Sequence, residues 1–404
     1  MSPTILKLPI YLDHNATTPV DPGVFEAMRP YFCEVFGNAA SRGHSFGWAA
    51  ESAVDRARQQ CAAILNANPN AIVFTSGSTE ANNLAIKGVA QAHKHRGRHI
   101  ITQATEHKAV LDPCKKLAAE GFDVTVLGVD ASGRIDLEEL TAALRPDTVL
   151  VSIMWANNEI GTIQPIRQIG ALCRERGVLF HTDATQAVGK VPVDVEADCV
   201  DLLSFSGHKL YGPKGAGVLF VRHKPRVELA CQLDGGGHER GYRSGTLNVP
   251  GLVGLGAACE LARQRMPIDT PRLTALRDRL ESGISASLTG ITINGDVRNR
   301  LAHMTNLTFD DVACDSMVVA LDDVAVSSGS ACTSACLEPS YVLLACGVPR
   351  ERAYSSLRYS LGRSTTEQEI DFAVEKTVQC IENLRELTAL TAIATGSDAE
   401  GETA

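Results

Sequence analysis

Short apolar, β-branched runs alternate with amphipathic segments between residues 70 and 222. Seven such runs occur along the chain: AIVFT, RHIIT, FDVTVL, TVLVSI, VLFHT, DLLSF and GVLFV. The segments between them, such as EANNLAIKGVAQAHKH and IRQIGALCRERG, have apolar residues at helical spacing. This alternation predicts an α/β layer sandwich around a mainly parallel, seven-stranded sheet. Such sheets bind ligands at the carboxyl ends of their strands, so polar residues after each run are the first candidates for a site.

The last third of the chain has a different pattern. Helical segments flank short strand-like runs around ITING and MTNLTF. A final helix is predicted where Thr366 and Glu369 form a capping box. Its apolar face would consist of Ile370, Val374, Val378 and Ile381.

This change of pattern divides the chain. We predict a large domain of residues 19–265 and a smaller α+β domain made of residues 1–18 and 266–404. The tail of residues 395–404, TGSDAEGETA, is polar and acidic, and we expect it to be disordered.

Composition and charge restrict the class of protein. The chain has 404 residues, 44% of them hydrophobic, and a formal net charge of −9 at pH 7. A negative balance does not favour general binding to nucleic acid or to anionic membranes. No apolar run reaches the roughly 18 residues of a membrane helix, and the N-terminus does not have the pattern of a secretory signal. We expect a cytoplasmic protein with no direct nucleic-acid or membrane partner.

The 12 cysteines are scattered singly along the chain, so we expect free thiols in a reducing compartment. Two of them, Cys332 and Cys336, stand four apart in SSGSACTSACLEPS. That stretch alone allows a metal site, a disulfide, simple packing or catalysis. No histidine follows His303, and a Cys-x3-Cys pair supplies only half of a tetrahedral zinc site. A cysteine-based metal-binding scaffold is therefore the less favoured class of function.

The stretch VFTSGSTEANNLAIKG is a candidate phosphate site. A Gly/Ser/Thr loop that enters a helix offers free backbone N–H groups and the positive end of the helix dipole. Ser78 and Thr79 add hydroxyl groups. The plain alternative is an ordinary turn in which Thr79 is the N-cap.

Two further residues stand where predicted strands end. Asp183, in FHTDATQAVGK, could hold a cationic ring nitrogen or could cap the following turn. Lys209, in SFSGHKLYGPKG, could become a Schiff-base nucleophile, although most lysines are simply exposed. A phosphate loop, an aspartate and a lysine together are the protein side of a pyridoxal phosphate (PLP) site.

With these residues in place, the sequence resembles the cysteine desulfurases, which are PLP enzymes of fold type I, and especially their housekeeping iron–sulfur cluster branch. The resemblance runs from YLDHNATTPVDP at residue 11 to LGRSTTEQEID near residue 371. It includes FTSGSTEANNLAIKG, TEHKAVLDPC, NNEIGTIQPI, HTDATQAVGK, SFSGHKLYGPKG, GGGHERGYRSGT and SSGSACTSACLEPSYV. It implies a PLP-dependent transferase with an α/β/α large domain and a smaller α+β domain.

The resemblance also implies roles for cofactor-binding residues. Lys209 would carry the PLP aldehyde and Asp183 would pair with the ring nitrogen. Gln186 would bind the ring hydroxyl, and His107 would stack on the ring and move protons. The remaining cofactor contacts implied are Ser78, Thr79, Asn158, Ser206, His208 and Thr246. Thr246 matches a residue that reaches the phosphate of the other subunit, which implies a homodimer; the plain alternative for GGGHERGYRSGT is a surface loop.

The implied substrate is L-cysteine. Arg358 would bind its carboxylate, with a structural salt bridge as the alternative, and Asn15 and Ala16 would lie near it. Cys332 would take the sulfur as a persulfide, leaving alanine. The persulfide would pass to an iron–sulfur scaffold protein or to sulfur-relay acceptors of tRNA thiolation. No resident metal is implied, although Cys332 would meet a nascent cluster on a scaffold. A selenocysteine lyase or another fold-type I enzyme is the alternative.

Three positions depart from the family pattern. Ala39 stands where proline is usual, TFDDVACDSM replaces a Glu-Gly-Glu run, and Cys336 replaces a small polar residue. Cys336 is either a neutral replacement or a residue that resolves the persulfide on Cys332.

Overall fold

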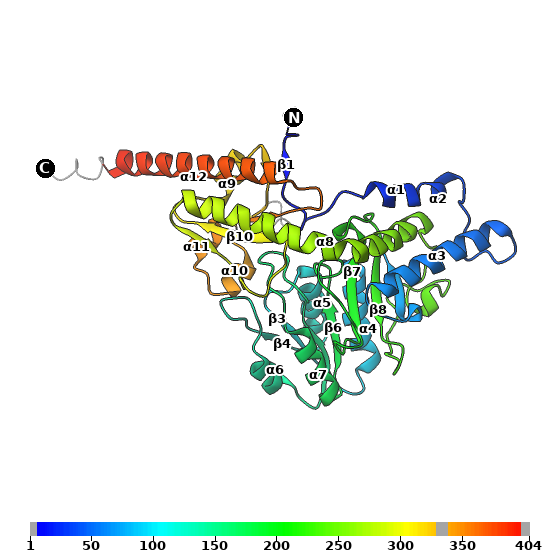
Figure 1. Cartoon of the computed structure of the whole chain (residues 1–404). Helices are drawn as coiled ribbons and strands as arrows, with labels where there is room; N and C mark the ends of the chain where they lie inside the picture. The colour runs from blue at the N-terminus through cyan, green and yellow to red at the C-terminus, as the bar shows by residue number, and fades with distance from the viewer. Residues whose placement is uncertain (1–5, 329–337, 397–404) are drawn as a thin grey trace.

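A computed structural model of the chain describes residues 6–328 and 338–396. All seven predicted runs are strands of one sheet, with the order β2-β8-β7-β6-β5-β3-β4 (Figure 1). Only β8 runs antiparallel to its neighbours, so the prediction of a mainly parallel sheet is confirmed. The strands are β2 (Ile72–Thr75), β3 (His99–Gln103), β4 (Asp123–Leu127), β5 (Thr148–Ser152), β6 (Leu179–Asp183), β7 (Leu202–Ser206) and β8 (Gly217–Val221).

Helices cover both faces of this sheet, which explains why most of its strands are apolar throughout. Val73 and its neighbours on one face pack on α4 (Ser78–His93) and α5 (Lys108–Ala119). Phe74 and the residues on the other face pack on α3, α7 and α8. These three helices are α3 (Ser45–Ala63), α7 (Ile166–Arg176) and α8 (Val249–Ser287). The result is the expected three-layer α/β/α arrangement.

A second core forms around a smaller antiparallel sheet with the order β12-β10-β9. Its strands are β9 (Ile291–Ile293), β10 (Met304–Phe309) and β12 (Ser356–Ser360). The N-terminal strand β1 (Ile10–Tyr11) pairs in parallel with β11 (Val324–Ala325) and contributes Ile10 to the same core. The helices of this part are α9 (Cys314–Ala320), α10 (Tyr341–Ala345), α11 (Arg350–Tyr354) and α12 (Glu367–Gly396).

Helix α8 connects the two parts. It runs across the molecule between the seven-stranded sheet and α12 (Figure 1). The domain boundary predicted at residue 265 falls inside this helix, so no loop separates the two parts there. The division into residues 19–265 and the rest of the chain stays a prediction.

The predicted capping box begins α12. The backbone N–H of Thr366 donates to Glu369 Oε2, and the backbone N–H of Glu369 donates to Thr366 Oγ1. Ile370 and Ile381 are fully buried in the second core. The helix continues to Gly396, and the rest of the tail predicted to be disordered lies outside the described residues.

The remaining helices are α1 (Pro22–Met28), α2 (Pro30–Cys33) and α6 (Leu137–Ala143). Within residues 6–328 and 338–396, no helix combines the length and apolarity needed to cross a membrane. Ten cysteines in these ranges are free thiols. Cys332 and Cys336 lie outside the described residues.

Candidate active site

A pocket of about 300 Å³ lies where strands β3, β5, β6 and β7 end. Eleven of the predicted site residues line it: Asn15, Ala16, Ser78, Thr79, His107, Asn158, Asp183, Gln186, His208, Lys209 and Arg358. The pocket therefore forms at the carboxyl edge of the sheet, where a doubly wound fold is expected to bind its ligand.

Lys209 enters the pocket from a single turn of 3-10 helix that follows β7 directly. Its Nζ donates hydrogen bonds to the carbonyl oxygens of Asn15, at 2.5 Å, and of Ala16, at 2.6 Å. The N-terminal segment thus holds the lysine amine at the pocket. Lys209 is therefore not a simple surface lysine.

Asp183 is the last residue of β6 and is 6% exposed. Its Oδ2 accepts a hydrogen bond from Asn82 Nδ2 at 2.7 Å, and its Oδ1 accepts one from the backbone N–H of Thr185 at 3.0 Å. Asp183 therefore caps the following turn and also lines the pocket, so the two interpretations of this residue are compatible. Sequence reasoning missed Asn82, which lies one turn into α4, because only the fold brings it to β6.

Glu106 is a second buried carboxyl group behind the pocket. One carboxyl oxygen accepts a hydrogen bond from the backbone N–H of Met154. Burial, and then the charge of Asp183, raise the pKa of Glu106 well above its usual range. Burial therefore favours the protonated form of Glu106 behind the pocket.

The N-terminus of α4 supplies hydrogen-bond donors on another side of the pocket. Gly77 is the N-cap and gives no side-chain cap, which leaves the first backbone N–H groups of the helix to a ligand. A Cβ atom at Gly217 would lie 2.6 Å from Gly77 Cα, and one at Gly77 would lie 3.7 Å from Ser206 Oγ. The lack of a side chain at Gly217 lets the Gly77 loop pack closely against β8, although the neighbouring Ser206 does not line the pocket itself.

Two histidines border the pocket. His107 is the N-cap of α5, where its Nδ1 accepts a hydrogen bond from the backbone N–H of Ala109. Burial, followed by the charge of Lys209, lowers the pKa of His208 to about 4. His208 is therefore neutral near pH 7 and can donate one hydrogen bond without adding a charge.

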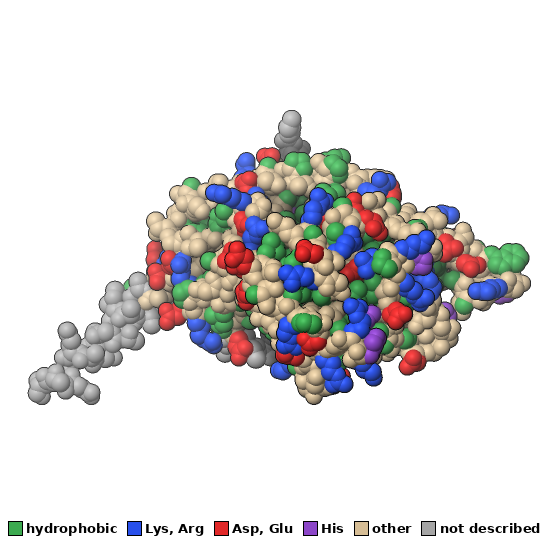
Figure 2. Space-filling model, turned by 90° about the horizontal axis from the view of Figure 1, so that it is seen from below, with side chains coloured by type: hydrophobic (Ala, Val, Ile, Leu, Met, Phe, Trp, Pro, Cys, Tyr) green, Lys and Arg blue, Asp and Glu red, His purple; other side chains and the backbone are tan. Residues whose placement is uncertain are grey.

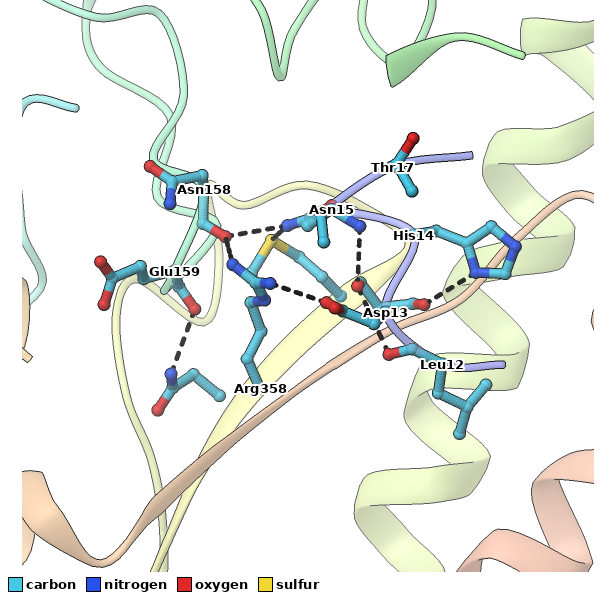
Figure 3. A network of polar contacts seen from close by, with 12 residues as sticks. Leu12, Asp13, His14, Asn15, Thr17, Asn158, Glu159 and Arg358 are labelled. Atoms are coloured by element: carbon cyan, nitrogen blue, oxygen red, sulfur yellow. Dashed lines mark hydrogen bonds and ion pairs between the residues drawn. The ribbon is translucent and has the colours of Figure 1, made fainter. Parts of the chain in front are cut away.

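Arg358 lies in the middle of β12 and is 3% exposed. Its guanidinium group donates to Asp13 Oδ1 at 2.7 Å and to the carbonyl oxygen of Asn158 at 3.1 Å (Figure 3). The structural salt bridge considered for Arg358 thus exists, with Asp13 as its partner. Arg358 still lines the pocket, so the ion pair with Asp13 also orients the guanidinium group there. Asp13 was not among the predicted site residues, although it lies in the motif YLDHNATTP.

The side chain of Asn15 is used within the protein. Nδ2 donates to the carbonyl oxygen of Asn158, and Oδ1 accepts from His303 Nε2 at 2.7 Å (Figure 3 shows the first contact). The part of Asn15 that contacts Lys209 is its backbone carbonyl. The side chain was expected near the substrate, and the structure gives it a role in joining β10, the N-terminal segment and the pocket.

The structure does not place two other predicted residues, Thr246 and Cys332, in this pocket. Thr246 is exposed and is not among the residues that line it. Cys332 lies outside the described residues, so its position relative to the pocket stays a prediction.

The pocket thus combines a strand-end lysine, a strand-end aspartate and an uncapped helix N-terminus. Residues 10–372 match the family Aminotransferase class-V. The chain belongs to this family. It is 56% identical to "Cysteine desulfurase IscS" of Pectobacterium carotovorum, over 95% of this chain and 96% of that protein. It is 54% identical to the human protein named "Cysteine desulfurase", over 95% of this chain and 84% of that protein.

A solved structure described as a NifS-like protein has the same fold. It superposes with a TM-score of 0.87 and 37% identity, over 93% of this chain and all of that one. These relatives place the class-V chain among the cysteine desulfurases, which are PLP-dependent enzymes. The resemblance predicted from the motifs is confirmed.

The residues present fit PLP. Asp183 supplies a carboxylate for a cationic ring nitrogen, and Lys209 supplies an amine for the aldehyde. The α4 N-terminus and the hydroxyl groups beside it supply donors for a phosphate. Among residues 6–328 and 338–396, no cluster of three or more His, Cys, Asp or Glu could hold a metal ion.

Proposed function

We propose that this cysteine desulfurase removes sulfur from L-cysteine and holds it as a persulfide on Cys332, releasing L-alanine. The single observation that carries the proposal is that Lys209, Asp183 and Arg358 line one pocket. When bound, PLP acts as an electron sink for the carbon next to the amino group of the substrate. The protein must then bind the carboxylate, move the Cα proton and accept the sulfur.

Lys209 is proposed to move the proton. The carbonyl oxygens of Asn15 and Ala16 hold its Nζ at the pocket. The amine would hold the cofactor aldehyde, and as a free base it would accept the Cα proton of the substrate. Asp183 would pair with the cationic ring nitrogen of the cofactor, and Asn82 and the Thr185 N–H hold its carboxylate in place.

Arg358 is proposed to bind the substrate carboxylate. A guanidinium group has five N–H donors in a rigid plane, and Asp13 and the Asn158 carbonyl accept from two of its nitrogens. The remaining donors suit a carboxylate in the pocket. Because Asp13 fixes the plane of the group, the substrate carboxylate meets it already oriented.

Cys332 is proposed to accept the sulfur. Its thiolate attacks the substrate sulfur, an S–S bond forms as the C–S bond breaks, and protonation of the former β-carbon yields the methyl group of alanine. The chain that leads to Cys332 starts beside Arg358, because Ser327 and Arg358 form backbone hydrogen bonds with each other. Cys332 is five residues further on, so an extended chain could carry it at most about 18 Å.

Two variants test this proposal. Lys209→Ala is expected to lose the absorption of the covalently bound cofactor. Cys332→Ala is expected to keep that absorption but to form no alanine from L-cysteine. Normal alanine formation by Cys332→Ala would refute the assignment of the nucleophile, and an unchanged cofactor band in Lys209→Ala would refute the assignment of the lysine.

We also propose that the protein is a homodimer with shared sites. Four aromatic side chains that are more than half exposed lie close in sequence: Phe32, Phe36, Phe46 and Trp48. Phe36 and Phe46 have ring centroids 5.4 Å apart. Hydrophobic side chains gather at the projecting end of the molecule where α3 begins (Figure 2). Exposed aromatic groups of this kind favour a protein interface. The family resemblance implies that Thr246 of a second copy would reach the phosphate site. Sedimentation analysis that finds only monomers at micromolar concentration would contradict this.

The acceptors of the sulfur are proposed to be an iron–sulfur scaffold protein and sulfur-relay proteins of tRNA thiolation. We propose a cytoplasmic location, which the ten free cysteines of the described residues support.

A further inference from the structure

A second, smaller cavity lies on the other side of Lys209. It has a volume of about 40 Å³, and its walls include His14, Lys190, Lys209 and His303. Lys209 lines both this cavity and the active-site pocket. Lys190 follows Gln186 in the segment after β6, the strand that ends at Asp183. The proposed mechanism gives Lys190 no part.

Lys190 is an unusual lysine. Among the ion pairs of residues 6–328 and 338–396, none includes Lys190, so no carboxylate there balances its charge. Burial, and then the charges of Lys209 and Arg358, lower the pKa of its amine well below the usual range. Lys190 is only partly exposed, and shielding a lysine amine from water without an acidic partner costs stability.

The contact that Lys190 does make leads to the cofactor pocket. Its Nζ donates a hydrogen bond to Gln186 Oε1 at 2.5 Å. Gln186 Nε2 in turn donates to the carbonyl oxygen of Asn15 at 3.0 Å. The same carbonyl oxygen accepts from Lys209 Nζ at 2.5 Å. A chain of hydrogen bonds therefore joins the two lysines through Gln186 and Asn15.

This chain determines which way the Gln186 amide points. The oxygen and nitrogen ends of a glutamine amide have nearly the same shape, so packing alone does not choose between them. If the amide were reversed, its oxygen would face the carbonyl oxygen of Asn15, and Lys190 Nζ would lose the oxygen that accepts its hydrogen bond. Both neighbours therefore select the orientation in which Nε2 is on the side of Asn15.

We propose that Lys190 is a positioning residue of the cofactor pocket. Lys190 fixes the Gln186 amide so that the N–H donors of the amide face Asn15 and the bound PLP. The inference rests on the proposed function and on the role that the family resemblance implies for Gln186, a hydrogen bond to the ring hydroxyl group of the cofactor. With Lys190 removed, only the Asn15 carbonyl holds the amide in this orientation, so the N–H donors are less firmly fixed towards the cofactor.

A double-mutant cycle on PLP binding tests this proposal. The measurements are the dissociation constant of PLP, added back to the full-length enzyme after removal of the cofactor, and the absorption maximum of the bound cofactor. The variants are Lys190→Met, Gln186→Ala and the double variant. Lys190→Met is expected to weaken PLP binding about five- to tenfold, the usual effect of one lost hydrogen bond, and to shift the absorption maximum. In the Gln186→Ala background the same substitution is expected to have no further effect, because its target is gone.

Controls separate positioning from a general loss of structure. Lys116→Met removes an exposed lysine from α5 and is expected to bind PLP like the wild type. Lys190→Gln keeps an N–H donor and is expected to stay within about twofold of the wild type; it also serves if Lys190→Met does not fold. An equal loss of affinity in both backgrounds, or no loss in either, would overturn the proposal. A Lys209→Ala variant that keeps its covalent cofactor would instead refute the proposed function, whatever Lys190 does.

Discussion

Arg358 has several partners for one guanidinium group. Asp13 and the carbonyl oxygen of Asn158 accept from two of its nitrogens, and its Nε–H is buried without an acceptor among the described residues. A buried charge with unused donors is costly for a residue that only stabilises the fold. The arrangement is better explained by an incoming carboxylate.

The first prediction therefore concerns Arg358→Lys. A lysine has one point of charge and cannot bind Asp13, the Asn158 carbonyl and a substrate carboxylate with the same geometry. We expect KM for L-cysteine to rise roughly ten- to a hundredfold, the effect of losing about 1.4 to 2.7 kcal/mol of charged hydrogen bonding. Steady-state alanine formation measures this, with cofactor absorbance as the control. A KM within twofold of the wild type would mean that the Asp13 pair is purely structural.

A second prediction concerns the effect of pH on buried histidines. Burial lowers the pKa of His14, His181 and His208 to about 4. In the unfolded chain these groups titrate near 6.5, so below that pH the unfolded state binds protons that the folded state does not. The contribution of these three histidines to the free energy of unfolding is therefore expected to be constant above about pH 6.5. This contribution is expected to decrease as the pH falls from about 6.5 towards 4.

Denaturant unfolding at pH 7, 6 and 5 measures this dependence. His181 is the best single test, because it is fully buried between the hydroxyl groups of Ser152 and Ser204. Each histidine contributes at most about 1.4 kcal/mol per pH unit. His181→Asn is expected to show a shallower pH dependence than the wild type, and an identical slope would exclude His181 as a contributor.

Among the helices, α7 ends at a glycine with a left-handed backbone. Gly177 has φ +66° and follows Arg176 as the C-cap. A Cβ atom at this position would meet no atom within 4 Å, so a substitution costs only backbone strain. Gly177→Ala is expected to lower the free energy of unfolding by about 1 kcal/mol.

Gly43 provides the matched control. A Cβ atom at Gly43 would also meet no atom within 4 Å, but its φ is not in the left-handed region. Gly43→Ala is expected to be neutral or slightly stabilising. If denaturant unfolding shows equal effects for the two variants, backbone conformation is not the reason for Gly177.

Helix α10 is fixed to the pocket by a buried contact. Ser340, its N-cap, donates from Oγ to Glu159 Oε2 at 2.5 Å and accepts from the backbone N–H of Leu343. The Tyr341 hydroxyl group donates to the carbonyl oxygen of Glu106. Glu159 lies beside Asn158 and Arg358 in Figure 3, so this contact joins α10 to the proposed substrate site. The chain carrying Cys332 leads directly into this helix.

The fourth prediction is that Ser340→Ala affects both stability and sulfur transfer. It removes the helix cap and leaves a buried carboxyl group without its donor, which costs about 1–3 kcal/mol of unfolding free energy. We expect slower alanine formation with unchanged cofactor absorbance, since α10 no longer holds one end of the Cys332 segment. Ser355→Ala, at an exposed hydroxyl group after α11, is the control. Equal rates for the two variants would show that the anchor does not matter for catalysis.

Across the whole molecule, the sequence predicts most of the architecture. All seven strands, the three layers and the capping box of α12 follow from apolar runs and local helix signals. Lys209 and Asp183 could be found because strand ends converge at one edge of a parallel sheet. On the face seen in Figure 2, acidic and basic side chains are interspersed, so no single charged patch identifies a ligand there.

Other parts of the site could not be predicted from the sequence. The partners of Asn82 and Asp13 are more than ninety residues away along the chain. Lys190 contacts Gln186 through a turn whose shape the sequence does not reveal. The Asn15 side chain turns towards His303 and Asn158, which depends on how β10 packs against the N-terminal segment. These contacts arise from tertiary packing, for which local patterns carry no signal.

The location of the sulfur after one turnover decides whether Cys332 is its acceptor. The full-length PLP-bound enzyme is mixed with L-cysteine, digested and analysed by mass spectrometry, with Cys336→Ser beside the wild type. We expect one additional sulfur atom on the peptide at Cys332 in both proteins, in proportion to the alanine released. Alanine released with no sulfur added at Cys332 would contradict the proposed chemistry.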